Sequence, residues 1–185
     1  MVEKNGGLGW RHLVNKAMVG RASVPAECFK MTEGSQNRFW IYRRRMPHWR
    51  LDGSVYFVTW RLHKSQKELS TPEREIIGST LKYFDGQRFD LFAYVVMPDH
   101  IHVLVKPSKG YFLHELVHSW KSFTANRLQH EGGREGKVWQ EDYFDRIMRD
   151  EAEFLEKAQY ILNNPLKINQ PLNEYHRVWV KPDFD

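Results

Sequence analysis

The chain has almost no cysteine and no long apolar run, and each shortage excludes a class of protein. Cys28 is the single cysteine among 185 residues, which excludes an intramolecular disulfide framework and a Cys-rich zinc site. No stretch approaches the ~20 apolar residues of a membrane-spanning helix. The first residues also lack the apolar core of a secretory signal. We therefore expect a soluble, cytoplasmic protein with no membrane partner.

The charge of the chain is mildly basic. The 28 Lys and Arg residues exceed the 23 Asp and Glu residues, which gives a formal net charge of +5 at neutral pH. Such an excess permits a nucleic-acid partner without identifying one. The length suits one domain of ordinary size with an appendage.

The beginning of the chain differs from the rest. Glycines interrupt residues 1–38 and no periodicity is sustained there, so we expect a weakly ordered N-terminal extension followed by one domain over residues 39–180. That domain begins with a basic cluster interleaved with aromatic residues, which includes Arg43, Arg44 and Arg45. The cluster is typical of a solvated surface and equally of a surface that holds phosphates and stacks on bases.

From Ser54 onward, apolar periodicity and turn residues predict an ordered series of elements. Thr71 is expected to cap the first helix because Pro72 and an acidic residue follow it. The expected strands cover 54–62, 91–97, 101–105 and 138–140, and the expected helices cover 71–84, 111–129 and 150–163. This order predicts an α+β fold: a ferredoxin-like antiparallel sheet of four strands with helices packed on one face, and then a C-terminal helix.

Two histidines with one residue between them form the most informative motif. His100 and His102 lie in an apolar strand, where alternation places them on one face and Ile101 on the other. Two imidazoles on a rigid strand supply most of a divalent-metal site, whereas one core histidine and one exposed histidine is the less favoured interpretation of this spacing. Alternation also turns Asp99 away from the pair, so we expect it to serve the turn.

The last expected helix carries a second unusual pair. Its apolar stripe contains Phe154, Ala158 and Ile161, and Tyr160 lies off that stripe. Asn164 follows Tyr160 by four residues, so the two are neighbours on one side of the helix. A tyrosine on a polar helical face is most often a surface residue, but here a phenol and an amide accompany a two-histidine strand.

Three segments in this order resemble the REP-associated tyrosine transposases, a branch of the single-tyrosine HUH transposases, where HUH denotes His–hydrophobic–His. The segments are residues 94–105 with the two histidines, 138–144 with Trp139, and 160–165 with Tyr160. A His–hydrophobic–His pair alone is weakly specific, whereas all three segments in this order and spacing are strongly so. The resemblance covers roughly residues 40–175 and leaves the first 38 residues unmatched.

The resemblance implies a metal-dependent endonuclease and strand transferase. It places His100, His102 and Asn164 as ligands of Mg²⁺ or Mn²⁺ and Tyr160 as the nucleophile on single-stranded DNA. The implied products are a 5′-phosphotyrosine link and a free 3′-hydroxyl, and reversal with a different 3′-hydroxyl rejoins the strands. Relatives recognise hairpins formed by repeated extragenic palindromes, and act as monomers or homodimers.

Substrate contacts and alternatives are less sharply defined by the sequence. The basic residues expected to contact phosphates are Arg43, Arg44, Arg45, Arg61, Lys64 and Lys121. A nucleotide hydrolase of the histidine-triad type would need a third histidine where the chain has Leu104. A non-catalytic DNA-binding protein on the same fold remains the alternative function.

Overall fold

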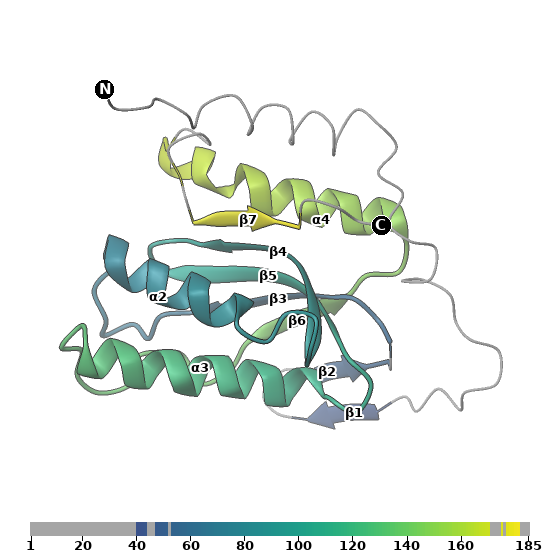
Figure 1. Cartoon of the computed structure of the whole chain (residues 1–185), viewed down its shortest axis with the longest axis horizontal. Coiled ribbons are helices and arrows are strands. Elements are labelled where there is room, and N and C mark those ends of the chain that lie inside the picture. The colour runs from purple at the N-terminus through teal and green to yellow at the C-terminus, as the bar shows by residue number, and fades with distance from the viewer. Residues whose placement is uncertain (1–39, 44–46, 52, 171–174, 176, 182–185) are drawn as a thin grey trace, which may run out of the picture.

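A five-stranded antiparallel sheet dominates the computed structural model, which describes residues 40–43, 47–51, 53–170, 175 and 177–181. Its strands lie in the order β6-β3-β5-β4-β7 (Figure 1). They are β3 (Tyr56–Arg61), β4 (Phe89–Val96), β5 (His100–Pro107), β6 (Phe144–Ile147) and β7 (Val178–Val180). A separate antiparallel pair, described for the backbone alone, comprises β1 (Trp40–Arg43) and β2 (Pro47–Arg50). The extension expected over residues 1–38 lies outside the described residues.

In the described residues, three α-helices cover the two faces of this sheet. They are α2 (Thr71–Lys82), α3 (Leu113–His130) and α4 (Glu151–Asn163), which continues into a 3-10 helix, η2 (Asn164–Ile168). The strand order β6-β3-β5-β4 with α2 and α3 on one face is ferredoxin-like, so the predicted fold class is confirmed. Helix α4 covers the opposite face (Figure 1). None of the helices in the described ranges is long and apolar enough to cross a bilayer.

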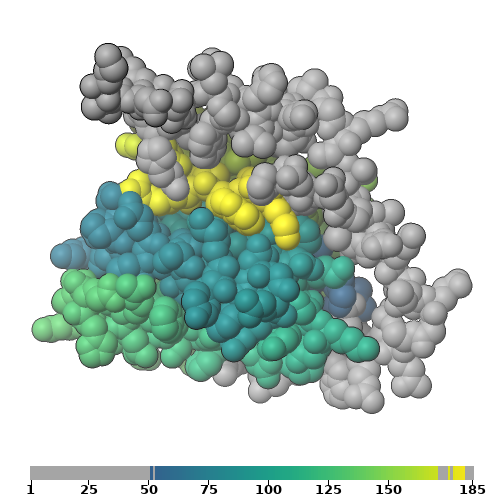
Figure 2. Space-filling model, in the orientation of Figure 1, coloured from purple at the N-terminus to yellow at the C-terminus, as the bar shows by residue number. Residues whose placement is uncertain are grey.

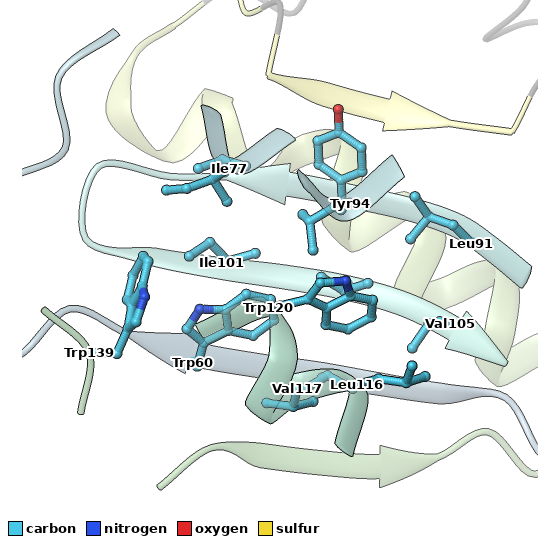
Figure 3. Close-up of a cluster of buried hydrophobic side chains, with 14 of the residues drawn as sticks. Trp60, Ile77, Leu91, Tyr94, Ile101, Val105, Leu116, Val117, Trp120 and Trp139 are labelled. Atoms are coloured by element: carbon cyan, nitrogen blue, oxygen red, sulfur yellow. The ribbon is translucent and has the colours of Figure 1, made fainter. Parts of the chain in front are cut away.

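Alternation along the strands divides the apolar side chains into two cores. On the face covered by α2 and α3, Trp60 and Ile101 are buried against Ile77 and Trp120 (Figure 3). On the other face, the buried strand residues pack against α4 and include Phe57, Val95 and Leu104. Strand β5 is therefore buried on both faces along its middle, which makes it a rigid support for side chains near its start.

The fifth strand, β7, was not expected from the sequence. It adds antiparallel to β4, with Val178 opposite Val95 and Val180 opposite Ala93. In Figure 2 the C-terminal segment, drawn in yellow, lies against the blue and teal segments that contain α2 and β4. Because β7 occupies the free edge of β4, the sheet has five strands rather than the expected four.

The fourth strand lies later in the chain than predicted. Of the expected strand over 138–140, only Trp139 pairs with Leu62, as an isolated bridge. Its indole is buried in the core of α2 and α3, where Nε1 donates to Thr124 Oγ1 at 3.0 Å. The edge position is taken by β6, whose residues alternate between exposed and half-buried and include two charges. A short polar edge strand of this kind carries little apolar signal.

The cap of α2 is displaced by one residue from the prediction. Ser70 is the N-cap and Thr71 is the first helical residue. The Ser70 backbone N–H donates to Glu73 Oε2 at 2.7 Å. With Ser70 as the cap, Glu73 occupies the third helical position, where a carboxylate bonds back to the cap in a capping box. A cap at Thr71 would place Arg74 at that position.

Candidate active site

His100 and His102 point to the same side of β5, as the sequence predicts. Their Cα atoms pair with those of Arg61 and Thr59 in β3, and the two ring centroids lie 4.7 Å apart. Ile101, between them, is fully buried in the opposite core. The alternation of the strand therefore brings two imidazoles together on the face that α4 covers.

The environment of His102 leaves one ring nitrogen without a partner. Only 6% of the residue is exposed, and its ring stacks on Phe57 with centroids 5.2 Å apart. Nδ1 lies 2.7 Å from Thr59 Oγ1. Nε2 is buried and has no hydrogen-bond partner among the described residues. Buried polar atoms without partners are rare in folded proteins and call for an explanation such as an ion or a substrate.

Electrostatics keep His102 neutral. Burial is the main reason that its pKa falls to about 3, because desolvation disfavours the protonated ring. Electrostatic interactions with the neighbouring His100, Lys167 and Arg61 lower the pKa further. The negative charge of Asp99 opposes these effects and is smaller. A neutral imidazole with its proton assigned to Nδ1 keeps a lone pair on Nε2, the form in which histidine binds metals.

Asp99 contacts His100, so the expectation that it faces away from the two histidines is wrong. Its Oδ1 lies 2.5 Å from His100 Nδ1, and its Oδ2 accepts a hydrogen bond from Arg61 at 3.0 Å. Asp99 lies in the turn between β4 and β5, where the alternation of a strand does not apply. A carboxylate that accepts from one ring nitrogen fixes the ring orientation and leaves the other nitrogen for a ligand.

Tyr160 reaches this pair from α4. Its ring centroid lies 5.3 Å from that of His102 and 6.0 Å from that of Phe57, both in edge-on contacts. The Nζ atom of Lys167 lies 3.8 Å from the centre of the same ring. Tyr160 remains 37% exposed, so a phenol accessible to a substrate lies beside two imidazoles from a different part of the chain.

The local sequence explains why α4 presents Tyr160 in this way. Asp150 caps the helix by accepting a hydrogen bond from the Glu153 backbone N–H at 2.8 Å. Phe154, Ala158 and Ile161 are buried against the sheet. This stripe fixes the rotation of α4, and the residue before Ile161 then falls at the margin of the packed face.

Asn164 lies one turn beyond Tyr160. It is only 1% exposed, and its Nδ2 donates to the Tyr160 carbonyl at 2.8 Å. That bond leaves Oδ1 as an oxygen acceptor. Within the described ranges, no three His, Cys, Asp or Glu side chains gather in a way that could hold a metal ion. A metal at the histidine pair would therefore need amide, water or substrate oxygens to complete its coordination.

The basic residues expected to contact DNA lie in different places. Arg61 ends β3 beside the histidine pair, and Lys64 is exposed in the turn that follows. Lys121 lies on α3, across the sheet, and its Nζ donates to the carbonyls of residues 140 and 141 at 2.8 and 2.7 Å. The side chains of the remaining three lie outside the described part of the chain: Arg43, whose backbone belongs to β1, Arg44 and Arg45. Their role in DNA binding stays a prediction.

Two neighbours of the site were not identified from the sequence. Thr59 reaches His102 because β3 and β5 pair in a register that one sequence does not reveal. Lys167 reaches Tyr160 because the chain turns into η2 after α4. The sequence feature that could have identified Lys167 is its spacing of two helical turns from Tyr160, which would place both on one side of a continuous helix.

Comparison with known proteins places most of this chain in one family. Residues 54–164 match the family model for IS200-like transposases. These residues contain the histidine pair, Tyr160 and Asn164, and they fall within the domain predicted over 39–180. The first 53 residues lie outside the match.

Individual relatives agree with the resemblance identified from the sequence. A protein of Haemophilus influenzae described as a REP-associated tyrosine transposase is 26% identical over 71% of this chain and 87% of its own length. The REP-associated tyrosine transposase of Escherichia coli is 23% identical over 69% of this chain and 79% of its own length. A solved REP-associated tyrosine transposase bound to a REP hairpin has the same fold, with a TM-score of 0.60, 20% identity, and coverage of 74% of this chain and 80% of that chain.

Proposed function

Because the chain belongs to the IS200-like transposase family, we propose that it cleaves and rejoins single-stranded DNA with Tyr160 as the nucleophile. The observation that supports this proposal best is the meeting of an exposed phenol on α4 with two imidazoles on β5. Tyr160 and His102 are 58 positions apart in the chain by their numbers, yet their rings lie 5.3 Å apart. Packing alone does not require an accessible phenol or an unpaired imidazole nitrogen at this point.

The residues present fit a divalent cation. The Nδ1 atoms of His100 and His102 are occupied by Asp99 and Thr59, so each ring has Nε2 left to bind a metal. Asn164 Oδ1 supplies the hard oxygen that Mg²⁺ and Mn²⁺ prefer, and the two nitrogens favour Mn²⁺. Bound there, the cation would polarise the scissile phosphate and neutralise its developing charge.

The chain's own groups carry the bond changes. The Tyr160 oxygen bonds to phosphorus while the bond from phosphorus to the 3′ oxygen of the preceding nucleotide breaks. The phenol proton passes to solvent and the released 3′ oxygen takes up a proton, so charge balances. The products are a 5′-phosphotyrosine link and a free 3′-hydroxyl. Attack by a second 3′-hydroxyl reverses the step and rejoins the DNA without an external energy source.

A folded DNA strand is the proposed substrate. The solved relative with the same fold is bound to a REP hairpin, and this chain carries a net positive charge of +5. Positive charge favours nucleic acid through neutralisation of phosphates. We infer that the chain acts on single-stranded DNA that forms a hairpin from a palindromic repeat.

A covalent-adduct assay tests this proposal. The full chain is incubated with hairpin-forming single-stranded DNA from its own genome, labelled at its 3′ end, in the presence of Mn²⁺ or EDTA. We expect a labelled protein–DNA adduct on a denaturing gel with Mn²⁺ and none with EDTA. His100→Ala should remove the adduct, whereas Asn164→Ala should reduce it less, since water can replace a neutral amide ligand.

A matched histidine variant controls for the loss of an imidazole. His118 is exposed on α3, across the sheet from Tyr160, so His118→Ala should form the adduct as the unchanged protein does. Equal adduct formation by His100→Ala and by the unchanged protein would contradict the metal assignment. Tight hairpin binding with no adduct under any metal would favour a non-catalytic DNA-binding protein instead.

A further inference from the structure

A lysine lies directly against the phenol of the site. Lys167 is in η2, the 3-10 helix that begins at Asn164 and Pro165 and turns the chain back toward α4. Its Nζ is 3.8 Å from the centre of the Tyr160 ring, closer than the 5.9 Å of Lys157, the other lysine over this ring. An ammonium group over an aromatic face is held there by the ring's negative electron cloud.

Among the described residues, Lys167 differs from its basic neighbours in having no carboxylate partner. Arg61 is paired with Asp99 at 3.0 Å, and Lys157 with Glu156 at 2.8 Å. Lys167 is exposed, and no carboxylate within the described ranges pairs with it. An exposed ammonium that lies against the phenol and has no carboxylate partner among the described residues is able to bind an anion there.

We propose that Lys167 binds a backbone phosphate of the DNA strand and thereby positions that strand against Tyr160. This proposal rests on the proposed function and names a contact within that site. Lysine is a compact point charge that binds phosphate without the planar geometry that arginine requires. Because its ammonium is already held over the Tyr160 ring, little freedom is lost when it contacts the DNA.

The salt dependence of binding separates a phosphate contact from a structural role. Affinity for a labelled single-stranded hairpin is measured from 50 to 300 mM salt in EDTA, with every variant in the full-length Tyr160→Phe background so that no cleavage occurs. Lys167→Met should weaken binding about tenfold at low salt. The slope of log K against log salt is negative, and its magnitude should fall by ~0.7, the contribution of one phosphate contact in single-stranded DNA. Lys167→Arg should restore most of both values.

A remote lysine controls for the change in net charge. Lys109 is exposed in the turn at the far end of β5 from His100. Lys109→Met should leave the affinity and the salt slope unchanged. If Lys167→Met matched Lys109→Met in both quantities, the proposal would be overturned. An equal loss in Lys167→Met and Lys167→Arg with an unchanged slope would also overturn it and indicate a structural role.

A scan of neutral linkages locates the phosphate. A series of hairpins is made, each with one neutral methylphosphonate linkage at a different position. The affinity of each hairpin is measured for the protein that keeps Lys167 and for Lys167→Met. We expect one position where the neutral linkage lowers the affinity of the protein that keeps Lys167 about tenfold but does not change the affinity of Lys167→Met. Equal sensitivity of both proteins at every position would overturn the proposal. These measurements need no catalysis, so a missing adduct with an intact slope difference would reject the proposed chemistry alone.

Discussion

Two buried ionisable groups, Arg134 and His102, lie on opposite faces of the sheet and differ in how completely they are bonded. In the layer of α2 and α3, Arg134 is 5% exposed and forms hydrogen bonds with both carboxylate oxygens of Glu73, itself 5% exposed. The same guanidinium also donates to the Gln66 side chain and to the backbone carbonyls of residues 67 and 68. On the α4 face, the equally buried His102 has a ring nitrogen with no partner in the described part of the chain.

The difference between Arg134 and His102 shows where a buried polar group lowers the stability of the fold. A paired and fully bonded guanidinium compensates for its burial, whereas an unpaired buried polar atom costs about 1–3 kcal/mol. Trp60 Nε1 in the other core is also without a partner among the described residues, but an indole N–H binds no cation, whereas His102 Nε2 lies in a ring beside the exposed phenol of Tyr160. Such a combination is typical of sites where a ligand completes the missing contacts. The α2 and α3 face therefore supports the fold, and the α4 face holds the proposed chemistry.

The largest expected effect belongs to the phenol. Tyr160→Phe removes one oxygen that packing does not require, so the free energy of unfolding should change by less than ~1 kcal/mol. Adduct formation should fall at least ~1000-fold, because phenylalanine has no oxygen that could bond to phosphorus. Denaturing gels and urea unfolding of the same preparation measure both quantities. Tyr83→Phe is the control, since that phenol is 73% exposed at the end of α2. An adduct in Tyr160→Phe would show that another residue is the nucleophile.

The opposite face should give the opposite pattern. Arg134→Met leaves the Glu73 carboxylate buried without its main partner, and we expect the free energy of unfolding to fall by about 3–5 kcal/mol. Adduct formation per folded molecule should change little, because Arg134 lies in the layer of α2 and α3. Urea unfolding and an adduct assay well below the melting temperature test the two halves of this expectation. Loss of adduct formation in a fully folded sample of Arg134→Met would show that the α2 and α3 face also contributes to activity.

The pH dependence checks the same ion pair. Burial alone would raise the pKa of Glu73, but hydrogen bonds from Arg134 and Ser70 outweigh it and lower the pKa from 4.5 to about 2. A carboxyl with a lowered folded-state pKa stabilises the fold above pH 4.5 and loses that contribution as the pH falls toward 2. The contribution is about 3 kcal/mol. The stability difference between the unchanged protein and Arg134→Met should therefore shrink between pH 5 and pH 3.

Sequence patterns predicted the parts of the site that depend on local rules. The alternation of β5 placed His100 and His102 on one face, and the helical period placed Tyr160 off the buried stripe. Both rules act over a few residues and need no knowledge of the tertiary fold. They also gave helices α2, α3 and α4 and the hairpin of β4 and β5, with boundaries shifted by at most two residues.

Contacts between distant segments could not be predicted from one sequence. Glu73 and Arg134 are 61 residues apart, and their pairing depends on how the start of α2 meets the loop that follows α3. Asp99 was misjudged because a turn breaks the alternation that was used to orient it. The burial of His102 against Phe57 likewise depends on packing between β3 and β5. His102→Ala should therefore leave a cavity, which makes His100→Ala the cleaner test of the metal.

A smaller effect is expected from Asp99. Asp99→Asn keeps the size of the side chain but removes the charge that His100 Nδ1 and Arg61 contact. A ligand imidazole then loses the carboxylate that orients it, which typically costs 10–100-fold in metal affinity. Titration of Mn²⁺ into the adduct assay should show a higher concentration for half-maximal activity, with the plateau largely kept. Asp90→Asn is the charge control, since Asp90 lies in β4 opposite Lys106, at the far end of the hairpin from Asp99. An unchanged Mn²⁺ requirement in Asp99→Asn would mean that Asp99 serves the turn alone.

The smallest expected effect comes from a change at Thr59, which tests the role of the unpartnered His102 Nε2 most directly. Thr59→Val keeps the shape of the side chain and removes the oxygen that lies 2.7 Å from His102 Nδ1. The proton of the neutral ring is then no longer held on Nδ1, so the form with a free Nε2 lone pair loses about 0.5–1.5 kcal/mol of preference. We expect the Mn²⁺ requirement to rise about three- to tenfold, with a similar cost to stability. Nitrogen-15 chemical shifts of the His102 ring provide the independent measurement: they should report a proton on Nδ1 in the unchanged protein and a mixture of tautomers in Thr59→Val. If the ring of the unchanged protein already carried its proton on Nε2, that nitrogen would be a donor rather than a ligand, and the contrast between the two faces of the sheet would lose its chemical meaning.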